Sequence, residues 1–201
     1  MPWSCTTHIS VTQAPVLSML VGREKDFIPS YITQLFGREY ALKLGIVKLE
    51  YPKGCNVILG MAHFIKTVED LYEALVNSCP SIRFGLAFCE ASGPCLVRFE
   101  GNDDELQNIA ATNANRLGCG HVFIIILRDA YPINVIDRIR SVPEVCTIFA
   151  ATANPLEVIV VATEQGNGVV GVIDGRRTEG VESVKDQEER RAFLRTIGYK
   201  K

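Results

Sequence analysis

Residues 56–75, NVILGMAHFIKTVEDLYEAL, join a strand pattern to a helix pattern. The first part, residues 56–64, is an apolar run that predicts a strand. Thr67 followed three positions later by Asp70 is close to a capping box, a common start of a helix. The apolar residues after it repeat with helical spacing. We therefore expect a strand that ends near His63 and a helix that begins four residues later.

Strand and helix patterns alternate on both sides of this stretch. Residues 82–91 and 96–99 flank a turn and predict a hairpin. Residues 121–127 are apolar without alternation, which is typical of a strand buried on both faces. We expect an α/β fold, with α+β as the alternative: a mixed β-sheet covered by helices in a single compact domain. We expect three more helices: one that begins after a cap at Asn102 or Asp103 and ends at Gly118, one near 133–142 and one at 186–197. We expect four more strands, at 46–51, 145–150, 157–163 and 169–173.

Length and charge limit the classes of protein that fit. The chain has 201 residues, enough for one domain at roughly 150 residues per domain. Its 21 Lys and Arg against 23 Asp and Glu argue against a nucleic-acid partner, which normally requires a basic surface. No apolar stretch approaches the roughly 18 residues that cross a bilayer. With no signal-peptide pattern either, we expect a cytoplasmic protein without a membrane partner.

The seven cysteines have two possible interpretations. None forms a C-x-x-C pair, and the three histidines lack the spacing of zinc ligands, so the sequence predicts no metal site. The first interpretation is that the cysteines are small buried hydrophobes in a reducing compartment. The second is a catalytic thiol, for which Cys89 beside Glu90 is the candidate.

Two histidines lie where chemistry is possible. His63 stands between a strand end and a helix N-terminus, whose free N–H groups attract phosphate, and Lys66 adds a full positive charge. An imidazole there can act as nucleophile, base or phosphate acceptor. The alternative is a histidine that only forms hydrogen bonds at a strand end. His121 follows Gly-Cys-Gly, and the two histidines share one site only if their strands are neighbours.

Residues 166–171 fit the pattern G-x-G-x-x-G. A dinucleotide-binding fold requires a helix after this motif, whereas here a strand follows, so a hairpin turn is the favoured interpretation. A glycine-rich hairpin also covers phosphates in protein kinases, but the other kinase motifs and the Walker A motif do not occur in this sequence.

Polar side chains stand at several predicted strand ends and turns. Glu90, Asn102, Thr152 and Asn154 are examples. Such residues commonly cap turns, and they also supply the hydrogen bonds that a nucleoside pocket requires. The sequence does not choose between these two roles.

Ordered stretches spread over residues 45–201 carry a family resemblance. They include residues 62–67 (AHFIKT), 84–93 (FGLAFCEASG), 97–104 (VRFEGNDD), 130–135 (AYPINV) and 163–175 (TEQGNGVVGVIDG). In these stretches the chain resembles the adenosine-specific kinases, a small archaeal and bacterial family. The resemblance places a family domain at 45–201 and leaves residues 1–44 as an N-terminal extension outside the match.

The resemblance implies an α/β protein that assembles into a homo-oligomer, with a trimer as one option, and binds adenosine or AMP. It implies phosphoryl transfer through a phosphohistidine, for which His63 is our choice and His121 the runner-up. Lys66 completes this catalytic set, with Glu90 taking the proton of a ribose hydroxyl. It identifies no phosphate donor, and Mg²⁺ is the one cofactor that we consider. The expected nucleoside-binding residues are Asn102, Thr152, Asn154, Gly166 and Gly168.

Two other functions stay open at this point. One is a nucleoside or AMP sensor without turnover, which the missing ATP motifs favour. The other is a purely structural oligomeric protein, which would gain no thermal stability from either ligand.

Overall fold

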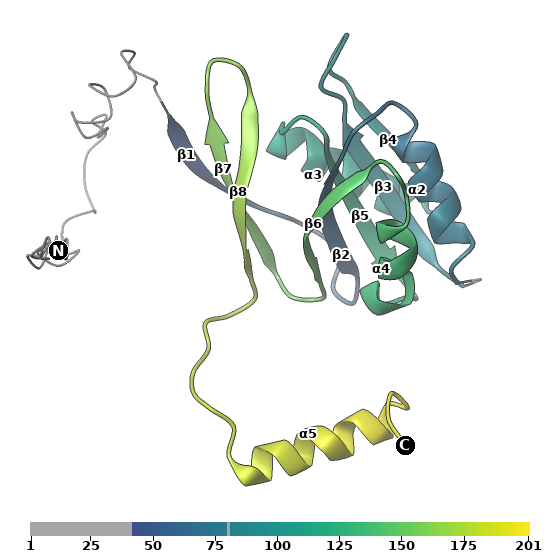
Figure 1. The fold of residues 1–201 in the computed structure, drawn as a ribbon, viewed down its shortest axis with the longest axis vertical. Coiled ribbons are helices and arrows are strands. Elements are labelled where there is room, and N and C mark those ends of the chain that lie inside the picture. Colours follow the sequence, from purple (N-terminus) through teal and green to yellow (C-terminus); the bar gives the residue numbers. More distant parts are fainter. Residues whose placement is uncertain (1–41, 80) are drawn as a thin grey trace, which may run out of the picture. The chain divides into compact units, whose positions relative to one another are not determined.

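The computed structural model describes residues 42–79 and 81–201 (Figure 1). Nearly all of the predicted extension at 1–44 lies outside the described residues, although the first strand already begins at Lys43. The strands are β1 (Lys43–Lys48), β2 (Asn56–Ala62), β3 (Arg83–Cys89), β4 (Val97–Gly101), β5 (Val122–Arg128), β6 (Val145–Thr152), β7 (Leu156–Ala162) and β8 (Asn167–Asp174). The helices are α2 (Thr67–Val76), α3 (Asp104–Leu117), α4 (Pro132–Arg140) and α5 (Val184–Thr196).

The strands form two sheets. The five-stranded sheet has the order β4-β3-β5-β2-β6, the three-stranded sheet has the order β1-β7-β8, and neighbouring strands in both are antiparallel. Side chains of α2 and α4 pack on one face of the five-stranded sheet. Those of α3 and the three-stranded sheet pack on the other. The α/β class that the sequence predicts is confirmed, with helices covering a sheet (Figure 1), but in place of one mixed sheet the described residues form two antiparallel sheets.

The centre of the core is β5. All residues from Val122 to Leu127 are buried, which confirms the predicted strand with two covered faces. Phe123 and Ile125 face α2 and α4, whereas Ile124 and Ile126 face α3. Because its neighbours β3 and β2 also lie between these layers, their ends are held rigidly, and a rigid sheet end can position side chains for chemistry.

Helix α3 has both caps that the sequence predicts. The Asp103 side chain accepts a hydrogen bond from the Leu106 amide at 3.1 Å, and Gly118 ends the helix with a left-handed φ of 54°. The helix also passes unusually close to β3. A Cβ atom at Gly85 would lie 2.0 Å from the backbone carbon of Leu106, so only glycine fits at this position.

The predicted capping box at the start of α2 is wrong. Lys66, not Thr67, is the N-cap residue, and its side chain caps no amide. The Thr67 hydroxyl instead donates to the carbonyl oxygen of Phe64 at 2.7 Å. A threonine hydroxyl can bond backward to the preceding turn as well as forward to the helix, and the sequence pattern does not distinguish the two.

Six of the seven cysteines lie within the described residues, and Cys79 among them is half-buried, whereas Cys5 lies outside. Cys55, Cys89 and Cys119 are buried, as the interpretation as small hydrophobes predicts. Cys95 and Cys146 are exposed, so that interpretation is wrong for these two. Among the described residues, no helix is long and apolar enough to cross a membrane.

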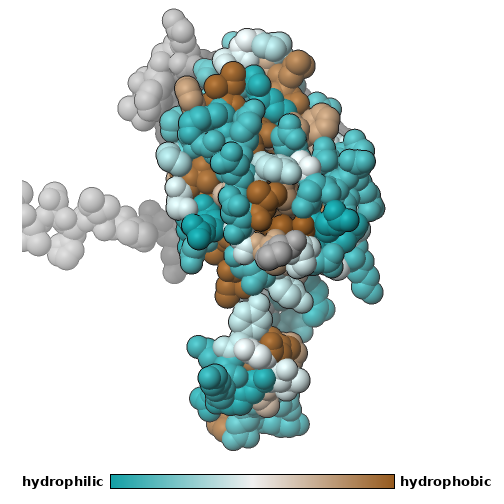
Figure 2. Space-filling model, turned by 90° about the vertical axis from the view of Figure 1, so that its right-hand side faces the viewer, coloured by the Kyte–Doolittle hydropathy of each residue, from teal (hydrophilic) through white to brown (hydrophobic). Residues whose placement is uncertain are grey.

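Helix α5 differs from the other helices because none of its residues is buried. It begins with a capping box in which the side chains of Ser183 and Asp186 bond each other's backbone amides. Figure 2 shows hydrophobic residues between hydrophilic ones at the surface of this helix, where Phe193 and the C-cap residue Ile197 are exposed.

Candidate functional site

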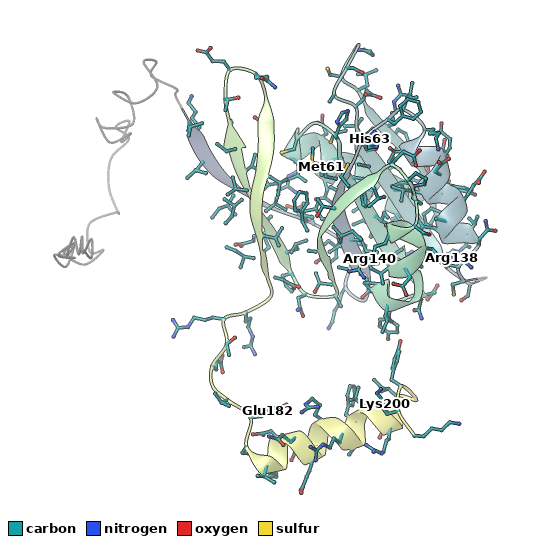
Figure 3. The ribbon with its side chains drawn as sticks, viewed as in Figure 1. Met61, His63, Arg138, Arg140, Glu182 and Lys200 are labelled. Atoms are coloured by element: carbon teal, nitrogen blue, oxygen red, sulfur yellow. The ribbon has the colours of Figure 1, made fainter. Side chains whose placement is uncertain are left out.

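Three of the predicted catalytic residues meet at one end of the five-stranded sheet. His63 follows the end of β2, Glu90 follows the end of β3, and His121 precedes the start of β5. Because these neighbouring strands are antiparallel, the end of one lies beside the start of the next. We call this end of the sheet the histidine edge, and Figure 3 labels His63 there.

The two histidines lie on neighbouring strands, which is the condition that the sequence left open. The Ala62 amide donates to the His121 carbonyl oxygen at 2.9 Å, and the His121 amide donates to the Cys89 carbonyl oxygen at 2.7 Å. The His121 ring stacks on Phe88, with centroids 5.9 Å apart. His63 is exposed. A phosphoryl group can therefore reach His63 more easily than the ring of His121.

Three of the four described non-glycine residues with a left-handed φ lie near the histidine edge, and the fourth, Asp129 with a φ of 59°, follows β5 at the opposite end of the sheet. Phe64 has a φ of 93°, His121 of 63° and Cys95 of 50°. Residues other than glycine rarely adopt this left-handed conformation, which costs roughly 1–3 kcal/mol each. Such strain persists where the surrounding structure requires a particular side-chain position, and it often marks a functional site.

Lys66 lies between two carboxylates. Its Nζ atom contacts Asp70 one turn further along α2 and lies 2.5 Å from Oε1 of Glu144. Hydrogen bonds to Asp70 and then to Glu144 raise the pKa of Lys66, so its side chain stays cationic at neutral pH. One positive charge beside two negative charges gives the group a net charge of −1.

Glu144 is the residue that the sequence interpretation missed. It precedes β6, its carbonyl oxygen accepts a hydrogen bond from the His63 amide at 2.9 Å, and it is only 4% exposed. Within the described residues, its Oε2 atom has no hydrogen-bond partner. The only sequence signal is a carboxylate after Pro143 and directly before a predicted strand.

Glu90 lies at the same edge, and its carboxylate is fully engaged. Oε1 accepts hydrogen bonds from the Ala91 amide and the Ser92 hydroxyl at 3.1 Å each, and Oε2 accepts one from Arg98 at 3.0 Å. Burial disfavours the charged form, but the bonds from Ser92, Ala91 and Arg98 outweigh it and lower the pKa of Glu90. Glu90 is therefore an anchored anion at neutral pH.

A cavity of about 640 Å³ opens beside the histidine edge. It lies between the β3–β4 hairpin, the C-terminal end of α3 and the β7–β8 turn, and Glu90, Asn115 and Gly120 line it. Gly166 and Gly168 line it from the turn, so the G-x-G-x-x-G motif is part of a hairpin, as its sequence context favours. The volume lies within the roughly 300–1,000 Å³ that is usual for small-molecule pockets.

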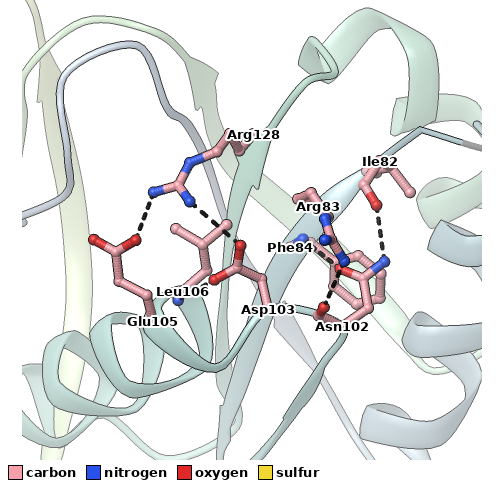
Figure 4. Close-up of polar contacts among 8 residues, drawn as sticks. All are labelled: Ile82, Arg83, Phe84, Asn102, Asp103, Glu105, Leu106 and Arg128. Atoms are coloured by element: carbon pink, nitrogen blue, oxygen red, sulfur yellow. Dashed lines mark hydrogen bonds and ion pairs between the residues drawn. The ribbon is translucent and has the colours of Figure 1, made fainter.

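Asn102 lies at the opposite end of the five-stranded sheet. Its side chain accepts a hydrogen bond from the Phe84 amide at 2.9 Å and donates one to the Ile82 carbonyl oxygen at 2.8 Å (Figure 4). These bonds hold the start of β3, far from the strand end that carries Glu90.

Thr152 and Asn154 also lie at this opposite end. Thr152 pairs with Val57 near the start of β2, whereas His63 follows the end of that strand. Both polar side chains donate to Oδ1 of Asp174, at 2.8 Å from Thr152 and 3.0 Å from Asn154. The structure thus brings Gly166 and Gly168 to the catalytic candidates but not Asn102, Thr152 or Asn154.

Burial makes Cys89 unsuitable as a catalytic thiol. Its side chain points into the core and donates to the Ala114 carbonyl oxygen at 3.4 Å. Burial raises its pKa to about 12, so the reactive thiolate is almost absent at neutral pH.

The sheet, the histidine edge and the cavity together define an α/β protein with a small-molecule-sized pocket beside the edge that carries two histidines. The chain belongs to the family described as adenosine specific kinase, whose family model matches residues 47–200. Among solved structures, the chain is similar to the PH1918 protein of Pyrococcus horikoshii OT3, with 43% sequence identity and a TM-score of 0.78. That match covers 80% of this chain and 99% of the other. A search among curated proteins gives no match.

Proposed function

We propose that the chain binds adenosine or AMP in the cavity and is a phosphotransferase in which His63 carries the phosphoryl group. The observation that carries this proposal is that His63 is exposed at the histidine edge, beside which the cavity opens. Gly120 lines the cavity, the next residue is His121, and the backbone of His121 is bonded to the residue before His63. A nucleoside in the cavity would thus lie close to His63, because neighbouring strands are only about 4.8 Å apart.

The proposed reaction has two steps. An imidazole nitrogen of His63 attacks the terminal phosphorus of a phosphoanhydride donor, such as a nucleoside triphosphate with Mg²⁺. A P–N bond forms, and the P–O bond to the departing diphosphate breaks. A ribose hydroxyl then attacks this phosphorus, the P–N bond breaks with its electron pair returning to the imidazole, and a carboxylate takes the hydroxyl proton. The free amides in the first turn of α2 favour the negative charge on the moving group.

A labelling experiment tests this function. The full chain is incubated with ATP and Mg²⁺, and its intact mass is measured under mildly alkaline conditions, in which phosphohistidine survives. We expect one added phosphoryl group in the wild type and in His121→Ala, and none in His63→Ala. Added adenosine should remove the group and yield AMP. If no donor labels the wild type and no AMP forms, the phosphotransferase proposal is wrong.

A sensor without turnover is the second candidate. The observation in its favour is that Lys66 is already paired with two carboxylates, so it offers no uncompensated charge to a phosphate. A sensor would bind adenosine or AMP and raise the melting temperature without forming product. If AMP places its phosphate at His63, His63→Ala should weaken AMP binding more than adenosine binding in calorimetric titrations. Equal losses would contradict that placement.

A further inference from the structure

We propose that Glu144 is the catalytic base that takes the proton from the acceptor hydroxyl when the phosphoryl group leaves His63. This inference rests on the proposed function and adds to it a residue that neither the sequence interpretation nor the family match identifies. Its basis is the pairing of β2 with β6, the burial of Glu144 and the state of its two carboxylate oxygens.

The strand register places Glu144 beside His63. Ala62 pairs with Val145 in antiparallel register, so the next pair outward is His63 with Glu144, and the His63 amide donates to the Glu144 carbonyl oxygen at 2.9 Å. Side chains of directly opposed residues lie on the same face of a sheet, with Cβ atoms about 4.5–5.5 Å apart. Glu144 is therefore the residue across the two strands from His63.

The two oxygens of the Glu144 carboxylate differ, because one is ion-paired and the other has no partner within the described residues. Oε1 lies 2.5 Å from Nζ of Lys66, which holds the side chain in place. Oε2 is buried and has no partner within the described residues. A buried polar atom without a hydrogen bond is costly, and more so when it is charged. The arrangement therefore points to a donor that arrives with the ligand, and a ribose hydroxyl is such a donor.

Glu90 does not offer the same chemistry. Both of its oxygens already accept hydrogen bonds, and Arg98 holds one of them. Both carboxylates are ion-paired, Glu90 with Arg98 and Glu144 with Lys66, but only Glu144 keeps an oxygen, Oε2, that accepts no hydrogen bond within the described residues. In the transfer step the hydroxyl proton passes to Oε2, the O–P bond forms, and the P–N electron pair returns to His63.

The test measures phosphoryl transfer from His63 to adenosine separately from the phosphorylation of His63 by a donor. Wild-type protein, Glu144→Gln and Glu144→Asp are phosphorylated on His63 with phosphoramidate, adenosine is added, and AMP formation is followed in single turnovers. We expect Glu144→Gln to accept the phosphoryl group normally but to transfer it about 100-fold or more slowly, as is usual for loss of a general base. Glu144→Asp should recover part of the rate.

Controls separate this role from a structural one. Glu69→Gln removes an exposed carboxylate from the same helix turn as Lys66 and should leave transfer unchanged. Circular dichroism checks that Glu144→Gln is folded. Wild-type transfer rates in a folded Glu144→Gln would overturn the inference, as would a Glu144→Gln protein that no longer phosphorylates at His63. If the wild type itself takes no phosphoryl group on His63, the proposed function fails, and the role of Glu144 fails with it.

Discussion

Burial controls the chemistry of individual side chains in this protein, and the cysteines show it most directly. Cys89 has a pKa of about 12 because it is buried, whereas Cys95 and Cys146 are exposed. Thiolates are the reactive form, and an ordinary thiol has a pKa near about 8.5. We expect iodoacetamide at about pH 8 to modify Cys95 and Cys146 and to leave Cys89 unmodified, as measured by peptide mass mapping. Labelling of Cys89 at the rate of Cys95 would contradict its burial.

The anchored Glu90 gives a prediction about pH. Its pKa is lowered in the folded state, so its stabilising effect is present above its unfolded pKa and is lost as pH falls through the folded value. Glu90→Gln should lower the free energy of unfolding by about 1 kcal/mol at neutral pH, because Arg98 is partly exposed and its ion pair is screened. The difference should shrink in acid.

Urea unfolding at neutral pH and below the unfolded pKa of glutamate, about 4.3, measures this effect. Glu100→Gln removes an exposed carboxylate from the neighbouring strand and serves as the matched control. An equal loss of stability for Glu90→Gln at both pH values would show that its ionisation is not the cause.

At the scale of elements, close packing of α3 on β3 depends on Gly85. A methyl group at this position would lie 2.0 Å from the Leu106 backbone, so the helix or the strand has to move. We expect Gly85→Ala to lower the free energy of unfolding by about 3 kcal/mol, the upper part of the usual range for overpacking. Chemical denaturation measures this loss. Gly45→Ala adds a methyl group to β1 where nothing lies within 4 Å, so a similar loss there would contradict this explanation.

The sequence predicts these elements well because their signals are local. The apolar run at 121–127, the Asp103 cap and the Gly118 end all correspond to structural features. Strand order is not local. Nothing near Glu144 indicates that β6 pairs with β2, and this pairing of residues about 80 positions apart creates its contact with His63.

Strand order also decides where the predicted nucleoside-binding residues lie. Asn102, Thr152 and Asn154 are polar residues at strand ends, as Glu90 is, but the antiparallel order sends them to the far end of the sheet. Polarity at a strand end is visible in the sequence, whereas the choice of end depends on which strands pair. Gly166 and Gly168 reach the cavity because the β7–β8 turn approaches the end of α3, where Asn167 donates to the Leu117 carbonyl oxygen at 3.4 Å.

At the scale of the whole molecule, two apolar surfaces within the described residues have no cover. Helix α5 has no buried residue, and its Phe193 is 61% exposed. On the outer side of the three-stranded sheet, Leu44 and Ile46 are 74% and 64% exposed. A helix of 13 residues is marginal in water without packing. Since both surfaces belong to every copy of the chain, we propose that α5 of one copy packs on the sheet of another, which gives the homo-oligomer that the resemblance implies.

Sedimentation velocity and light scattering test this assembly on the full chain. We expect a closed oligomer, for which a trimer is one option, and we expect the double variant Phe193→Glu with Ile46→Glu to dissociate to monomers. Glu188→Gln changes an exposed charge on the same helix and should leave the oligomer intact, because charged residues at an interface rim contribute little. Dissociation should also reduce the helical signal in circular dichroism, since α5 loses the surface on which we propose that it packs. A wild type that stays monomeric at high concentration with α5 fully helical would refute this arrangement, because the helix would then be stable without a second copy.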